Sequence, residues 1–116
     1  MILAKIVHDG KEYIFEKIRV DKERILCVSV KNINKYYFQF DWENVIGVGT
    51  IEVMATNDGI NFSVMKYGDD VDMILNIDTA DGASYFADYI GHNAKYLCFK
   101  ITGFTDGYFK GTINFV

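Results

Sequence analysis

The stretch that decides the fold is KYYFQFDW at residues 35–42, in which aromatic and polar side chains alternate. Successive side chains of a β-strand point to opposite faces, so a strand here would gather four large rings on one face. Those rings are Tyr36, Phe38, Phe40 and Trp42. The opposite face would carry Tyr37, Gln39 and Asp41. The pattern therefore predicts a half-buried strand whose aromatic face lies in the core.

Similar alternation recurs on both sides of this stretch, and turn residues separate the segments. The Asp-Gly pair at residues 9–10 predicts a hairpin between residues 2–8 and 11–17, and Asn-Asp-Gly at residues 57–59 predicts a second tight turn. Beyond that second turn we expect three side chains to continue the core, namely Ile60, Phe62 and Val64. Residues 84–90 fit either period, and we favour a short strand there, with a helical turn as the alternative.

The composition favours strands throughout the chain. Val and Ile total 24 residues, whereas Leu and Ala total 10. Together with Thr and the aromatic residues, strand-favouring residues make up 48 of the 116. We therefore predict an all-β fold with about nine strands and little helix. Two antiparallel sheets would pack as a sandwich of jelly-roll or Greek-key type, in one domain spanning residues 1–116.

The net charge narrows the range of partners, and the expected compartment predicts the state of the two cysteines. With 12 basic and 16 acidic side chains the net charge is −4, which disfavours a nucleic-acid partner. We see no apolar run long enough to span a bilayer and no secretory signal, so we expect no membrane association and folding in a cytoplasm. In that reducing compartment Cys27 and Cys98 would be free thiols.

No group of residues predicts catalysis, so we expect no enzyme and no cofactor. The two histidines, His8 and His92, are not spaced to form a pair with Cys98 or a zinc site. The acidic residues of one predicted turn leave a calcium site as a weaker alternative to a solvated turn; they are Asp69, Asp70 and Asp72. A small hydrolase is the least favoured function.

Two longer motifs carry a resemblance to a known family. Residues 36–62 comprise a strand ending in Trp42, a Gly-Thr turn at residues 49–50, a second strand and an Asn-Asp-Gly-Ile-Asn-Phe hairpin. Residues 95–115 read KYLCFKITGFTDGYFKGTINF. Together they resemble small β-sandwich structural proteins of tailed bacteriophages, although Phe62 and Cys98 stand where Trp and Arg are common in that family.

The resemblance implies a virion structural protein with no catalytic residue to carry over. Its role would be capsid decoration, as an auxiliary protein docked on the assembled shell, or otherwise a tail component. Its partners would be the major capsid protein or other virion proteins, together with further copies of itself, for example in a trimer. The chain would fold in the host cytoplasm and then reside in the virion.

A carbohydrate-binding module on a tail or host-attachment structure is the alternative function. It would use exposed aromatic rings, for which the candidates are Tyr37, Tyr67, Tyr96 and Tyr108. For docking on a partner, the candidate contact residues are Ile14, Phe15, Tyr37 and Tyr108. Ile14 and Phe15 are adjacent, so one of them should face outward from the N-terminal hairpin, residues 1–17. We expect this hairpin to be a docking element whose deletion leaves the sandwich folded.

Overall fold

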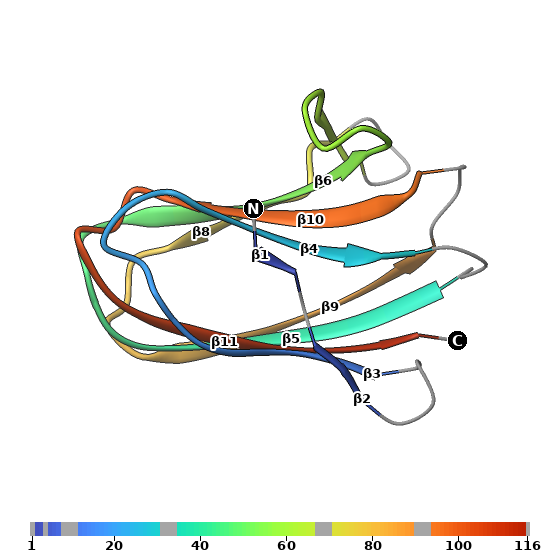
Figure 1. Ribbon diagram of the computed structural model, residues 1–116. Helices are drawn as coiled ribbons and strands as arrows, with labels where there is room; N and C mark the ends of the chain where they lie inside the picture. Colours follow the sequence, from blue (N-terminus) through green and yellow to red (C-terminus); the bar gives the residue numbers. More distant parts are fainter. Residues whose placement is uncertain are drawn as a thin grey trace.

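The chain folds into two β-sheets packed face to face (Figure 1). The structure is a computed structural model that describes residues 2–3, 5–7, 12–30, 35–66, 71–89 and 94–115. Within these ranges there are eleven strand segments and no helix, and nine of the segments contain three or more residues. The segments are β1 (Ile2–Leu3), β2 (Lys5–Val7), β3 (Glu12–Arg19), β4 (Arg24–Ser29), β5 (Lys35–Ile46), β6 (Gly49–Thr56), β7 (Ser63–Val64), β8 (Ile74–Ile77), β9 (Gly82–Tyr89), β10 (Tyr96–Thr102) and β11 (Asp106–Phe115).

The strands are connected as a jelly roll. Sheet A has the order β1-β4-β10-β6-β7, with β8 also paired to β6, and sheet B has the order β2-β3-β11-β5-β9. Strands that follow one another along the chain repeatedly cross between the sheets, from β3 to β4, β5 to β6, β8 to β9 and β10 to β11. At these crossings the chain passes from one sheet to the strand opposite in the other sheet, which is the jelly-roll arrangement. The predicted all-β sandwich is therefore confirmed, and β1 with β4 forms a parallel pair within sheet A.

Aromatic side chains fill the space between the sheets. Phe38 and Phe40 of β5 meet Phe99 of β10 with ring centroids 4.4 and 5.1 Å apart, and all three are buried. Edge-on and offset contacts of this kind stabilise aromatic clusters beyond the area that they bury. Gly111 of β11 makes room for them, because a Cβ there would lie 2.7 Å from the Phe40 ring. The alternation predicted for β5 is thus confirmed for Phe38, Phe40 and Trp42.

The N-terminal segment is divided between the two sheets. β2 and β3 form the predicted hairpin, with the turn itself outside the described residues. β1, however, pairs with β4 in sheet A and takes no part in that hairpin. β3 lies between β2 and β11 as an interior strand of sheet B, and its Phe15 is 2% exposed. Removal of residues 1–17 would take most of an interior strand out of sheet B, so we now expect this deletion to disrupt the sandwich.

The strand predicted for residues 84–90 is present, whereas the segment after the Asn-Asp-Gly turn does not enter the core. β9 pairs antiparallel with β5 from Gly82 to Tyr89, so the strand predicted for residues 84–90 is confirmed up to residue 89. The core predicted beyond the Asn-Asp-Gly turn is wrong. Ile60 is 79% exposed, and Phe62 and Val64 pack on the outer face of sheet A. The reason is that residues 57–62 form a loop, after which the short strand β7 pairs with β6 at the edge of sheet A. Val64 is there opposite Met54, whose side chain lies on the outer face.

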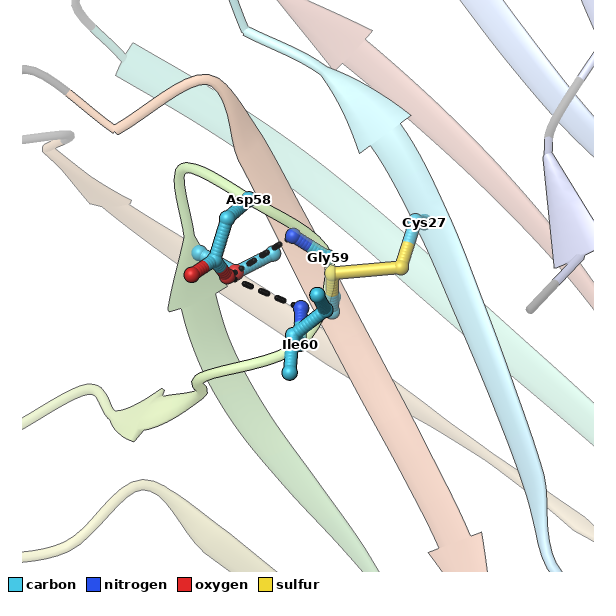
Figure 2. The surroundings of a disulfide bond; sticks show 6 residues. Cys27, Asp58, Gly59 and Ile60 are labelled. Carbon is cyan, nitrogen blue, oxygen red and sulfur yellow. Dashed lines mark hydrogen bonds between the residues drawn. A yellow bond between two sulfur atoms is a disulfide. The ribbon is translucent and has the colours of Figure 1, made fainter.

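A disulfide lies beneath this loop (Figure 2). Cys27 of β4 and Cys98 of β10 are directly opposite in the antiparallel ladder, with Cα atoms 4.2 Å apart. The predicted free thiols are therefore wrong, because the strand register brings together two residues that are 71 positions apart. With Met54 the two cysteines form a small buried group, here called the disulfide cluster. Four partly buried side chains pack on it: Ile25, Phe62, Val64 and Tyr96.

Candidate functional site

The outer face of sheet B brings together three of the four predicted contact residues. Tyr37 of β5, Tyr108 of β11 and Ile14 of β3 alternate with buried neighbours, so all three point away from the core, and each is partly exposed. The fourth, Phe15, points into the core and offers no surface to a partner. The outward residue of the Ile14–Phe15 pair is therefore Ile14. The candidate contact residues that remain exposed are Ile14, Tyr37 and Tyr108.

The strand register fixes how these side chains lie next to polar ones. Tyr108 is opposite Glu43, Lys110 is opposite Asp41, and Thr112 is opposite both Gln39 and Ile14. The register between β3 and β11 shifts between Phe109 and Gly111, so that β3 contributes two residues opposite one of β11. This bulge leaves Lys17 on the outer face although Phe15, two positions earlier, is buried.

Opposite charges alternate across this face. Lys17 Nζ lies 2.7 Å from a Glu43 carboxylate oxygen and 4.4 Å from the centroid of the Tyr108 ring. The hydrogen bond to Glu43 and its negative charge raise the pKa of Lys17 above its ordinary value. Lys35 similarly lies 5.0 Å from the ring of Tyr37. Each of the two tyrosine rings therefore has a lysine ammonium over its face, and this cation–π contact is attractive.

Further along the same face Arg19 is paired with Asp106. Arg19 Nε donates to Asp106 Oδ1 at 3.0 Å, and this hydrogen bond raises the pKa of Arg19. The same contact, followed by the hydrogen bond from the Gly107 backbone N–H, lowers the pKa of Asp106. A depression of about 430 Å³ lies on this face at the Lys17–Glu43 pair. It is lined by Lys17, Asp41, Trp42, Glu43, Tyr108, Phe109 and Lys110.

A second depression, here called the loop groove, lies beside the loop that covers the disulfide cluster. Its volume is about 450 Å³, and it is lined by Ala55, Thr56, Asn57, Asp58, Asn61, Ser63 and Ala94. The Asn-Asp-Gly pattern predicts the turn at residues 57–59 but no binding site there. The available signal was the density of amide, hydroxyl and carboxyl groups between residues 56 and 63.

Asp58 holds this loop together. One of its carboxylate oxygens accepts the backbone N–H of Ile60 at 2.8 Å (Figure 2). The same oxygen accepts the backbone N–H of Asn61 at 2.8 Å, and the other oxygen accepts the Asn61 side-chain amide. These donors favour the charged carboxylate and hold the pKa of Asp58 far below its usual range. The backbone N–H groups of Asn61 and Ile60 have the largest effect. Thr56 Oγ1 donates to the same carboxylate and accepts the Gly59 N–H.

The other predicted chemical groups are only partly within the described structure. His8, His92, Tyr67, Asp69 and Asp70 lie outside the described residues. Asp72 forms a salt bridge with Lys66 at 2.7 Å. The described residues contain no group of three or more His, Cys, Asp or Glu side chains that could hold a metal ion. Tyr96 is partly buried against the disulfide cluster.

The fold and these two surfaces are the basis for proposing a function, because the comparisons with family models and curated sequences assign none. No protein-family model matches the chain, and no curated protein sequence matches it significantly. Over the described part of the chain no helix is long and apolar enough to cross a membrane. The observations define the class of protein: an all-β jelly-roll domain with a mixed aromatic and charged outer sheet face.

Proposed function

We propose that the chain is a non-enzymatic structural protein of a tailed-bacteriophage virion, a capsid decoration or auxiliary protein that docks on the assembled shell. The observation that carries this proposal is the outer face of sheet B. No described element covers that face, and it displays Ile14, Tyr37 and Tyr108 among paired charges. The fold is consistent with the role, because jelly rolls build viral shells, although they also form lectins.

The chemistry of the face suits a specific protein contact. Tyrosine is enriched where proteins meet, since its ring supplies apolar area and its hydroxyl a hydrogen bond. The lysines beside the Tyr37 and Tyr108 rings position cationic groups next to that area. Exposed pairs such as Lys17–Glu43 add little affinity at the rim but set orientation by charge complementarity. Binding would thus depend on Ile14 and the two tyrosines and be oriented by the charges.

The proposal includes further copies of the chain as partners, with a trimer as one arrangement on the shell. The major capsid protein or another virion protein would supply the opposing surface. In this view the domain folds in the host cytoplasm before it docks, because it has its own core, and the Cys27–Cys98 disulfide forms once the chain has left that reducing compartment.

The test uses virions purified from the virus that encodes the chain. We expect mass spectrometry to find the chain in the particles, and labelled recombinant protein to bind particles that lack it. Replacing one hot-spot ring, Tyr108→Ala or Tyr37→Ala, should weaken particle binding about tenfold. The matched control is Ser29→Ala, an exposed residue of sheet A. Absence of the chain from particles would overturn the proposal, and so would tyrosine variants that bind like the control.

A further inference from the structure

The loop groove lies on the other sheet from the proposed docking face and has a different chemistry. Five of its seven lining residues carry hydroxyl, amide or carboxyl groups: Thr56, Asn57, Asp58, Asn61 and Ser63. Its volume of about 450 Å³ is within the range of small-molecule sites. Most such sites are lined by apolar groups, so a groove this polar favours a ligand rich in hydrogen-bonding groups.

Several of these polar groups still have bonding capacity directed to solvent. Within the described structure, the Asn57 amide accepts a hydrogen bond from the Lys95 N–H through its oxygen, and its NH₂ group makes no hydrogen bond. Asn61 uses its NH₂ group on Asp58, which leaves its side-chain oxygen as an acceptor. The Ser63 hydroxyl, exposed at the start of β7, has no partner among the described residues. The groove thus offers donors and acceptors together, as a sugar diol requires.

The loop presents these groups in a fixed arrangement. Four hydrogen bonds to the Asp58 carboxylate close the turn, and the Lys95 N–H anchors Asn57 beside the first residue of β10. A ligand would therefore meet polar groups that are already ordered, which reduces the entropy lost on binding.

Charge narrows the ligand class further. The nearby rings of Phe62 and Tyr96 pack on the disulfide cluster and do not line the groove, so the hydrogen-bonding groups and the charge define the ligand. The Asp58 carboxylate in the groove and the net charge of −4 both repel anions.

We propose that the loop groove, with Asn57, Asn61 and Ser63 as hydrogen-bonding groups, binds a neutral carbohydrate. The site is independent of the outer face of sheet B, so a virion protein docked through that face would still present the groove. A shallow groove of this kind binds a mono- or disaccharide with a dissociation constant of about 1 mM.

The experiment is a titration of the ¹⁵N-labelled chain with neutral sugars, followed by the backbone amide signals. The probes are glucose, galactose, N-acetylglucosamine, lactose, cellobiose and maltose, each raised to about 50 mM, and N-acetylneuraminic acid serves as the anionic comparison. We expect saturable shifts confined to residues 56–63 and 94–96 with at least one neutral sugar, and none with the anionic one.

Variants then test the named groups. Ser63→Ala removes a hydroxyl that makes no bond in the described structure, so it should leave the fold intact and weaken binding about fivefold. Asn61→Ala should weaken binding at least as much, and its amide spectrum reports whether the loop remains folded. Thr112→Ala, which removes a hydroxyl from the opposite sheet, is the matched control and should bind like the wild type. The proposal is overturned if no neutral sugar gives saturable shifts, if the shifts map elsewhere, or if Ser63→Ala and Asn61→Ala both bind like Thr112→Ala.

Discussion

At the scale of single residues, one carboxylate organises the loop above the disulfide. Asp58 accepts two backbone N–H bonds, one amide bond and one hydroxyl bond, although the residue itself is exposed. Such bonds favour the charged form, so protonation of this one group should loosen the loop. The consequence can be measured as a dependence of stability on pH.

Acid should destabilise the wild type more steeply than the variant Asp58→Asn. The folded-state pKa of Asp58 lies below that of an unfolded aspartate, so between about pH 5 and pH 2 the unfolded state binds more protons. The stability contributed by Asp58 is complete above that window and is lost as the pH falls through it. Thermal unfolding measured at several pH values should show a smaller change of Tm for the variant.

The control for this measurement is Asp78→Asn. Asp78 is exposed, and its carboxylate makes no hydrogen bond or ion pair in the described structure, so its variant should retain the wild-type slope. A wild-type slope in Asp58→Asn as well would contradict the role given to this carboxylate.

At the scale of elements, adjacent residues of β3 have opposite roles. Phe15 packs between the sheets with its ring centroid 6.5 Å from those of Phe40 and Phe99, whereas Ile14 faces outward over sheet B. The strand is therefore both a core element and part of the proposed docking face. Deletion of the N-terminal hairpin would remove the core contact and the proposed docking residue together. Substitutions at Phe15 and at Ile14 test the two roles separately.

Phe15→Ala should reduce the free energy of unfolding by about 3 to 5 kcal/mol, because it leaves a cavity beneath sheet B. Ile14→Ala should change it by about 1 kcal/mol or less, since its side chain is partly exposed. Urea unfolding of the two variants gives both values. Equal losses would show that the face assignment of β3 is incorrect.

Within residues 35–42 the sequence was sufficient to predict which side chains face inward, but it did not predict how the strands pair. Alternation in residues 35–42 depends only on local geometry, and Phe38, Phe40 and Trp42 are indeed buried. The pairing of Cys27 with Cys98 depends on the register of two strands far apart in the sequence, which local patterns do not specify.

The predicted contact residues likewise depended on local patterns and not on how distant segments pack. Alternation was enough to identify Tyr37 and Tyr108 as outward residues, and adjacency was enough to require that Ile14 or Phe15 face out. The exposure of Ile60 was missed because a loop that folds over the outer face of a sheet has the same apolar spacing as a strand that enters the core.

At the scale of the whole molecule, the disulfide links segments that are distant along the chain. Cys27 and Cys98 enclose a sequence separation of 71 residues, and both are fully buried. In the chain-entropy description, closing a loop of this length stabilises the folded state by about 4 kcal/mol through its effect on the unfolded chain.

Reduction should therefore lower the midpoint of guanidinium unfolding without abolishing the fold. The six paired positions of β4 and β10 remain when the covalent link is cut. The double variant Cys27→Ala with Cys98→Ala should show a comparable decrease in the absence of reductant. Midpoints that do not change after mass spectrometry has verified complete reduction would contradict this prediction.

The placement of β10 and β11 has a consequence for how the chain is made. β10 lies between β4 and β6 in sheet A, and β11 lies between β3 and β5 in sheet B, yet both follow every other strand along the chain. Neither sheet can close until residues 96–115 have emerged from the ribosome, so the domain folds after synthesis of this segment and not progressively during it. Until then the apolar faces of the earlier strands are exposed to other nascent chains.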